Sequence, residues 1–326
     1  MEKARRASLN ITIEGVDVSR DIAPFLLSFE YVDNPPGEAD EVQIELEDPD
    51  GRFRGDWLPK RNARIVAEIA IADWHKPGDV RSLACGSFEI DEIQAGGPPS
   101  TVSIKGVSAP VTSKGRREQR TRAWEEITLR EIASDVANQS KLTLSYETAK
   151  NPKWRRIDQR EESPLAFLNR MAVRAGLSVK VVDDKLVLFD DEEQSGSVTI
   201  RMWEGEVVSW EFGTQSGDVY KSCEVAYRDP KKKSFVKAVA MADGEEDEPS
   251  GHTKKVNTRV ETQAEAERIA RDTLKHLNRR EVTGSMTLLG NPSLVVGMKA
   301  TVAGFGTFDG TYNIAKTSAK DRKSVV

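Results

Sequence analysis

The chain contains 326 residues, which is long enough for roughly two to three domains. Hydrophobic residues make up 38% of it and charged residues 31%, with a mean hydropathy of -0.52, a composition typical of soluble folded proteins. The net charge of -5 comes from acids and bases interleaved along most of the chain, which argues against a surface dedicated to gripping nucleic acid. No apolar run approaches the ~20 residues of a bilayer-spanning helix, so we expect no membrane insertion.

Residues 1–110 are predicted to form a first β-barrel domain. Apolar residues recur at every second position between turn signals, as in Leu9–Ile13, Val42–Leu46 and Ile65–Ile71. Glycine and proline clusters such as Asn34–Gly37 lie between these runs and supply the backbone dihedrals of tight turns. Meanders of short strands usually close into a small barrel or sandwich.

Residues 111–195 are predicted to form an α+β domain. Thr128 and Glu131 form the capping box of a first helix, whose apolar residues follow the spacing i, i+3, i+4. A second helix begins with Ser163 as N-cap and Pro164 in the first turn, and it ends at Gly176. Two strands then follow, joined through a turn at Asp183–Asp184, so the region combines two helices with a hairpin.

Residues 196–326 are predicted to form a second β-barrel domain with a long acidic loop and one helix. Strand patterning returns at Val207–Phe212 and Tyr220–Tyr227, and Gly244–Gly251 is too acidic and turn-rich for a core. Thr262 caps a helix that presents one apolar side. The predicted fold class is therefore α+β and mainly β, with two small β-barrel domains flanking a helix-containing α+β domain.

The sequence lacks the motifs of common catalytic, metal-binding and phosphate-binding sites. His75, His252 and His276 do not have the spacing of a zinc hydrolase, and glycine clusters lack the strand-to-helix context of phosphate binding. The segment Asp48–Asp56 lacks the register of a calcium loop, and we interpret it as a β-turn. The acid pairs Glu161–Glu162 and Asp183–Asp184 are assigned to a helix start and a hairpin turn instead of glycan cleavage. We predict no catalytic, cofactor-binding or metal residues, and no enzyme activity.

Three further assignments are structural. Cys85 and Cys223 each lie within a predicted strand, so we expect reduced thiols instead of a disulfide bond. The basic stretches Lys114–Arg122 and Lys231–Lys233 lack interleaved aromatic residues, and we interpret them as solvated loops.

A family resemblance appears in three parts of the chain. The segment Asp158–Leu177, with its Ser-Pro helix start, its Phe-Leu pair and its closing glycine, leads into a hairpin that ends at Lys185–Phe189. This arrangement resembles the late control gene D proteins of phages, which supply the tail hub. The upstream segment Trp124–Ala133 is similar to the family's first helix, and Gly304–Ile314 is similar to its closing barrel strands. The resemblance covers residues 120–315, and the first barrel only by architecture.

The resemblance implies a structural role in a contractile tail or phage-derived injection particle. Three copies would form a ring with six similar barrel positions, joined to a hexameric tail tube protein on one face and to a trimeric spike protein on the other. Other baseplate proteins would also bind. From the net negative charge we expect a lumen biased toward acidic side chains, through which DNA would pass without specific binding. The subunit would assemble in the host cytoplasm and remain in the virion tail or particle baseplate.

The resemblance leaves alternatives open, and the chain departs from the family at one point. The main alternative is a tail-associated peptidoglycan hydrolase, and a type VI secretion spike would normally need a fused needle. Family members usually continue past Tyr312–Ile314 with an aromatic-rich strand, whereas this chain continues as Lys316–Val326. We therefore expect the last barrel to lack a strand and to offer its open edge to a partner.

Overall fold

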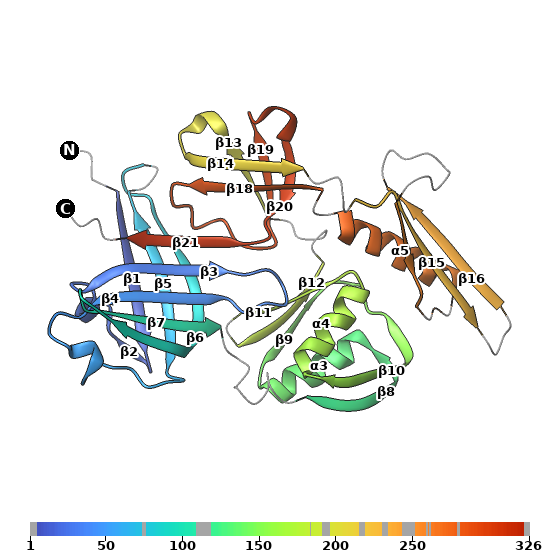
Figure 1. Cartoon of the computed structure of the whole chain (residues 1–326), viewed down its shortest axis with the longest axis horizontal. Helices are drawn as coiled ribbons and strands as arrows, with labels where there is room; N and C mark the ends of the chain where they lie inside the picture. Colours follow the sequence, from blue (N-terminus) through green and yellow to red (C-terminus); the bar gives the residue numbers. More distant parts are fainter. Residues whose placement is uncertain are drawn as a thin grey trace.

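The computed structural model describes residues 5–73, 76–108, 119–182, 184–190, 196–214, 219–229, 234–242, 252–258, 260, 262–278 and 281–322. These residues form a mainly β protein with few helices, which confirms the predicted α+β class. Figure 1 shows one large sheet beside a smaller β unit, a unit with two helices, and a further unit in which one helix covers a sheet. No helix in the described part of the chain is long and apolar enough to cross a bilayer.

The largest element is an eight-stranded antiparallel sheet, called sheet A here, in the order β2-β1-β5-β6-β7-β4-β3-β21. Its strands are β1 (Arg6–Ile13), β2 (Val16–Asp17), β3 (Leu26–Asp33), β4 (Glu41–Glu47), β5 (Arg64–Ala72), β6 (Val80–Gly96), β7 (Thr101–Ser108) and β21 (Thr317–Arg322). Side chains alternate between faces, so Val42, Ile44 and Leu46 are buried on one side of β4 as predicted. The short helices α1 (Ser19–Ile22) and η1 (Arg52–Arg54) lie in its connections. Together these elements form the first β unit.

The last strand of sheet A comes from the other end of the chain. β21 pairs antiparallel with β3, from Thr317 opposite Asp33 to Arg322 opposite Ser28. The segment assigned by its sequence to the second barrel domain therefore completes the first sheet (Figure 1). In addition, no sheet of the described residues closes into a barrel, so the prediction of two closed barrels is not confirmed. The pairing between β21 and β3 depends on a contact across most of the chain, which a local pattern cannot report.

The α+β unit spans residues 119–190 and confirms the predicted helix starts. Its elements are β8 (Arg120–Thr128), α3 (Leu129–Ser140), β9 (Thr143–Glu147), β10 (Lys153–Glu162), α4 (Pro164–Arg174), β11 (Ser178–Val182) and β12 (Lys185–Phe189). Thr128 and Glu131 form a reciprocal capping box, a type of contact that stabilises a helix by about 1 kcal/mol. Ser163 accepts the N–H of Ala166, and Pro164 begins α4. The apolar faces of α3 and α4 pack on Trp154 and the hairpin β11–β12.

The second β unit comprises residues 196–214 and 281–313. Its elements are β13 (Ser197–Arg201), η2 (Met202–Glu204), β14 (Val207–Thr214), β18 (Val282–Leu288), β19 (Lys299–Ala303), η3 (Gly306–Phe308) and β20 (Gly310–Asn313). They form a three-stranded sheet, β13-β19-β20, and the two-stranded ribbon β14-β18. An aromatic cluster joins the two, because Phe212 contacts Phe305, Phe308 and Tyr312 at ring separations of 5.1–5.7 Å. This packing gives support to a ribbon that would be marginal alone.

A separate unit is inserted between β14 and β18. It consists of β15 (Ser222–Asp229), β16 (Ser234–Met241), β17 (Thr253–Val256) and α5 (Gln263–Asn278). The helix begins as predicted, with the N–H of Glu265 donated to the hydroxyl of Thr262 over 3.1 Å. Its apolar side packs on the sheet β16-β15-β17, with Ala266, Ala270 and Leu274 buried. The helix predicted for the last domain therefore belongs to a separate unit with its own small sheet and core.

Candidate functional site

The histidines and cysteines form no reactive centre in the part of the chain that the structure describes. His252 is exposed before β17, His276 lies in α5, and His75 lies outside the described residues. Among the residues that the structure describes, no three His, Cys, Asp or Glu side chains gather in a way that could hold a metal ion. Cys85 and Cys223 are free and buried, as expected, and burial raises the pKa of the Cys85 thiol to about 12. That thiol is therefore protonated at neutral pH and a poor nucleophile.

The segment Asp48–Asp56, which follows β4, forms a turn as predicted, with the short helix η1 inside it. The buried carboxylate of Asp48 accepts hydrogen bonds from the N–H of Phe53 at 3.1 Å and from Nε of Arg54 at 2.8 Å. Gly51 has a φ of 74°, a left-handed conformation that glycine adopts without strain. The carboxylate of Asp48 is therefore occupied by donors of the protein itself, and these hydrogen bonds hold the loop together.

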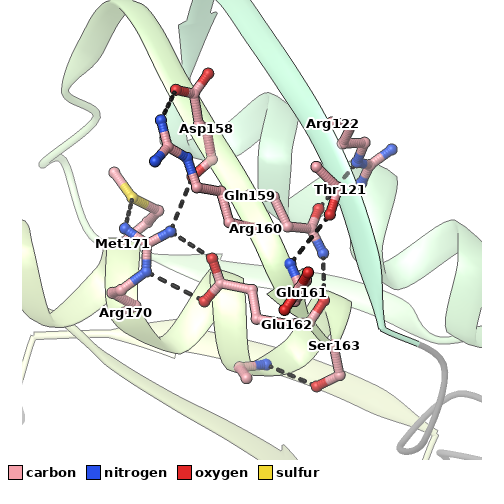
Figure 2. A network of polar contacts seen from close by, with 11 residues as sticks. Thr121, Arg122, Asp158, Gln159, Arg160, Glu161, Glu162, Ser163, Arg170 and Met171 are labelled. Carbon is pink, nitrogen blue, oxygen red and sulfur yellow. Dashed lines mark hydrogen bonds and ion pairs between the residues drawn. The ribbon is translucent and has the colours of Figure 1, made fainter.

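The acid pair Glu161–Glu162 lies in a charged network at the start of α4 (Figure 2). Arg170 donates to both carboxylate oxygens of Glu162, at 2.5 and 3.2 Å, and to the backbone oxygen of Asp158 at 3.1 Å. Arg160 donates to Asp158, and this hydrogen bond is the main reason that the pKa of Asp158 is lowered. Glu161 is exposed, and its N–H is donated to Thr121.

Beneath this network, a buried amide ties β8 to the end of β10, just before α4 begins. Gln159 is fully buried, accepts from Nε of Arg122 at 3.0 Å and donates to the backbone oxygen of Glu162 at 2.9 Å (Figure 2). Glycan cleavage needs one carboxyl group that is kept protonated by its surroundings. Asp158 instead faces Arg160 and Arg156, which favours its ionised form, and Glu162 is held by Arg170. The network is therefore suited to fixing the helix and not to acid catalysis.

In the second acid pair, Asp183–Asp184, the described residue Asp184 has a structural role. Asp184 forms the turn between β11 and β12 and lies 3.5 Å from Arg64 of sheet A, whereas Asp183 lies outside the described residues. Both partners of the Asp184–Arg64 pair are exposed, so the pair contributes little to stability. Of the two basic stretches, Lys114–Arg122 is described only from residue 119 onwards, and Lys231–Lys233 lies outside the described residues.

A buried ionic joint connects three units, and no local sequence pattern indicates it. Lys180 of β11 contacts the carboxylate of Asp33 at the end of β3, and its Nζ lies 3.3 Å from Oδ1 of Asp40. The other carboxylate oxygen of Asp33 accepts the N–H of Val296 from the second β unit at 2.8 Å. Nearby, the N–H of Gly37 is donated to the backbone oxygen of Val179 at 2.9 Å. We call Asp33, Asp40 and Lys180 the junction triad.

The junction triad holds one cation against two carboxylates away from water. All three residues are at most 9% exposed. Burial raises the pKa of Asp40 to about 6, although the attraction of Lys180 and the N–H of Asn34 act in the opposite direction. An unpaired charge at such a site is costly, so the triad fixes how the α+β unit and second β unit meet sheet A.

The second β unit exposes large apolar side chains. Trp203 of η2 is 68% exposed, and Met202, Val208 and Trp210 are exposed beside it in the sequence. A side chain at Gly304 would overlap the ring of Trp203, so the indole lies directly against that backbone. Trp210 in turn packs edge-on against Phe305 at 5.4 Å. Exposed aromatic residues held in place by packing are typical of protein interfaces.

The first β unit has an apolar hollow between residues of β1, β4 and β7 and the segments around α1 and η1. It is lined mainly by the apolar side chains Ile13, Val18, Ile22, Leu46, Phe53 and Trp57. The rings of Phe25, Phe53 and Trp57 support one another edge-on at 5.4–6.3 Å. Asp21 is the charged residue in the lining, and it does not meet a second ionisable lining group there. The hollow is therefore suited to apolar contact.

Known proteins match this chain in sequence and in fold. The model of the family described as phage tail baseplate hub (GPD) matches residues 109–320. The probable baseplate hub protein of Escherichia phage 186 is 33% identical over 180 residues, which are 54% of this chain and 43% of that protein. The match therefore spans less than half of that relative's length.

Two solved structures share the fold at low sequence identity. The 43 kDa tail protein of prophage MuSo2 from Shewanella oneidensis has a TM-score of 0.71 and 12% identity, over 97% of this chain and 94% of that one. The tail protein from Neisseria meningitidis MC58 has a TM-score of 0.70 and 13% identity, over 97% and 93%. The whole described arrangement, including sheet A, is therefore a fold found in other proteins.

Proposed function

Because this chain belongs to the phage tail baseplate hub (GPD) family, we propose that it is a structural subunit of a tail hub. In this role it joins the tail tube to the central spike of a contractile tail or a phage-derived injection particle. The family match carries the proposal, since it includes the α+β unit, the second β unit and most of β21. The subunit assembles in the host cytoplasm and stays in the particle baseplate.

We further propose that three copies form the hub ring. Each chain contributes two β units, so three chains supply six positions on which a hexameric tube protein can stack. The two units are unequal, with eight strands in sheet A against a three-stranded sheet and a two-stranded ribbon. The two units are attached to each other, because β21 follows the second unit in the chain and pairs with β3 of the first. This attachment supports the proposal that both units bind the tube protein. A ring requires a fixed spacing between neighbouring binding positions, and the attachment of the two β units provides this spacing within each chain.

The opposite face of the ring is proposed to hold the trimeric spike, and other baseplate proteins bind around it. DNA would pass through the lumen without specific binding, consistent with the net charge of -5 and the interleaved charges. The edge of β20 that does not face β19 remains a proposed site for a partner strand.

We propose that the hub subunit has no catalytic activity. The carboxylates considered for peptidoglycan cleavage are exposed or paired with arginine, as at Glu162 and Asp158. A peptidoglycan digestion assay with the purified chain tests this point. Turnover that a single substitution such as Glu162→Gln abolishes would establish the hydrolase alternative instead.

The experiment that tests the ring combines mass measurement with imaging. Light scattering of the purified chain should give three times the 36.2 kDa mass of one subunit. Electron microscopy of the chain mixed with its tube and spike proteins should show a three-fold ring between them. A ring of another symmetry, or a chain that binds neither protein, would refute the proposal.

A further inference from the structure

The loop between β3 and β4 contains a buried acid and also contacts the α+β unit. We call residues 34–40 the junction loop, and Figure 1 shows it reaching from sheet A toward β11. Asp40 at its end is 4% exposed, and Gly37 donates its N–H to the backbone oxygen of Val179 at 2.9 Å. Gly37 also lies against α4, because a side chain there would come within 2.7 Å of the amide of Asn169. The junction loop therefore connects the first β unit to the α+β unit.

The junction triad has one more negative than positive charge when both of its carboxylates are ionised. Asp33 and Asp40 share a single ammonium group, that of Lys180, at a site away from water. Asp33 is in closer contact with this group, and its second oxygen accepts the N–H of Val296. Asp40 lies 3.3 Å from the ammonium group and accepts the N–H of Asn34 at 2.9 Å. The uncompensated charge therefore lies mainly on Asp40.

The other charged side chains around the junction loop have partners elsewhere or face water. Glu38 within the loop is exposed, and Glu41 just after it pairs with Lys105 of β7 at 2.9 Å. β7 also presents the uncharged hydroxyl of Ser108, which accepts the last N–H of the loop at 2.9 Å. From α4, Arg170 donates to a carboxylate and a backbone oxygen of its own unit. These groups leave the charge balance of the junction triad unchanged.

The charge on Asp40 is opposed by its surroundings. Burial raises the pKa of Asp40 from 3.8 to about 6 and Asp33 adds to this rise, whereas Lys180 and the N–H of Asn34 lower the pKa. An ionised Asp40 is therefore stabilised when water reaches it, and water reaches it when the junction loop separates from β11. A protonated Asp40 gains nothing comparable from that separation.

We infer that the junction loop is a pH-sensitive switch, in which a proton on Asp40 keeps the loop on β11 and loss of the proton favours its separation. The hydrogen bonds from Asn34 to Asp40 and to Ala39 lie within the loop, so they preserve its shape. The bonds that break are those to Val179 and Lys180 of β11. The inference goes beyond the proposed function, because it concerns the single chain and holds whether or not copies form a ring.

The size of the effect follows from the pKa of Asp40 in the closed and open forms of the loop. With a pKa of about 6 when closed and the ordinary 3.8 when open, ionisation favours opening by a factor of up to about 100. Opening is least frequent at low pH and increases as the pH rises through about 6. Between pH 5 and pH 7.5 the increase is about tenfold, because part of the change already occurs below pH 5.

Hydrogen exchange of the Gly37 N–H measures this opening in the full chain. After correction for the ordinary effect of pH on exchange, opening should be about tenfold greater at pH 7.5 than at pH 5. The N–H of Ile44, within β4 of sheet A, should exchange more slowly than that of Gly37 at both pH values, since the sheet stays folded. Equal opening at the two pH values, or exchange at Gly37 as slow as that at Ile44, overturns the inference.

A second test assigns the pH dependence to Asp40. Asp40→Asn keeps the shape of the side chain without its charge, so the pH dependence of opening at Gly37 should disappear. Asp73→Asn is the matched control and should retain it, because Asp73 is also buried and pairs with Arg6 at 3.1 Å, but lies in the connection between β5 and β6.

A measurement on the wild-type chain does not depend on the folding of a variant. The carboxyl carbon of Asp40 should titrate near pH 6 in NMR spectra, and the N–H resonance of Gly37 should shift with the same midpoint. Titration of Asp40 near its ordinary value of 3.8, or a pH dependence of opening that persists in Asp40→Asn, overturns the inference.

Discussion

Replacing Lys180 by Met should weaken the joint between the units more than any exposed lysine substitution would. The ammonium group of Lys180 lies against Asp33, 3.3 Å from Asp40 and 3.3 Å from the backbone oxygen of Asn34. Methionine fills much of the same space, but it leaves two buried carboxylates without a cation. Removing one partner of a buried ion pair costs about 3–5 kcal/mol.

Hydrogen exchange reports this change where it occurs. The N–H groups of Gly37 and Val296 bridge the units, through bonds to Val179 and Asp33. A loss of about 3 kcal/mol corresponds to exchange that is roughly a hundredfold faster when the joint opens locally. The effect should be smaller at pH 5 than at pH 7.5, because Asp40 takes up a proton readily and a neutral carboxyl group needs no cation.

Lys105→Met provides the matched control. Lys105 pairs with Glu41 at 2.9 Å, but both side chains are more than a third exposed, and such pairs are worth about 0–1 kcal/mol. Equal protection of Gly37 and Val296 in the two variants would refute the reasoning, since it would mean that Lys180 is not needed to compensate the buried acids.

Three further outcomes are expected. The raised pKa of Asp40 contributes stability that is complete below its ordinary value of 3.8 and is lost as the pH rises through about 6, so urea midpoints should fall between pH 4 and pH 6 in the wild type and less in Asp40→Asn. Thr128→Ala removes the capping box of α3 and should cost about 0.5–2 kcal/mol, measured as a lower urea midpoint of the α+β unit. Gly304→Ala should displace Trp203, visible as a shift in tryptophan fluorescence, while Gly306→Ala, at a position with a positive φ but open space around it, should not.

The contacts between the units of this molecule suit the proposed role as a tail hub subunit. Sheet A, the α+β unit and the second β unit meet at the junction triad, and β21 adds a second connection through six paired residues. Two independent connections restrict rotation of the β units about each other. A hub that receives a tube on one face and a spike on the other needs that restriction.

The sequence by itself determined the features that depend on neighbouring residues. Thr128 with Glu131, and Ser163 with Pro164, predicted the two helix starts because a cap satisfies backbone groups within a few residues of itself. Alternation of apolar residues likewise predicted strands of sheet A such as β1, β4 and β5, and turn residues predicted the loop at Asp48.

Only the tertiary structure decided how these elements combine. Lys180 alternates with Val179 and Val181 as a solvent-facing residue would, and it is buried because Asp33 and Asp40 arrive from a segment more than 130 residues earlier. The strand at 317–322 has the polar, exposed pattern of an edge strand, and no feature of the neighbouring sequence indicates that it pairs with β3. Backbone pairing is open to any strand edge of suitable geometry, so the choice of partner depends on where the rest of the chain places that edge.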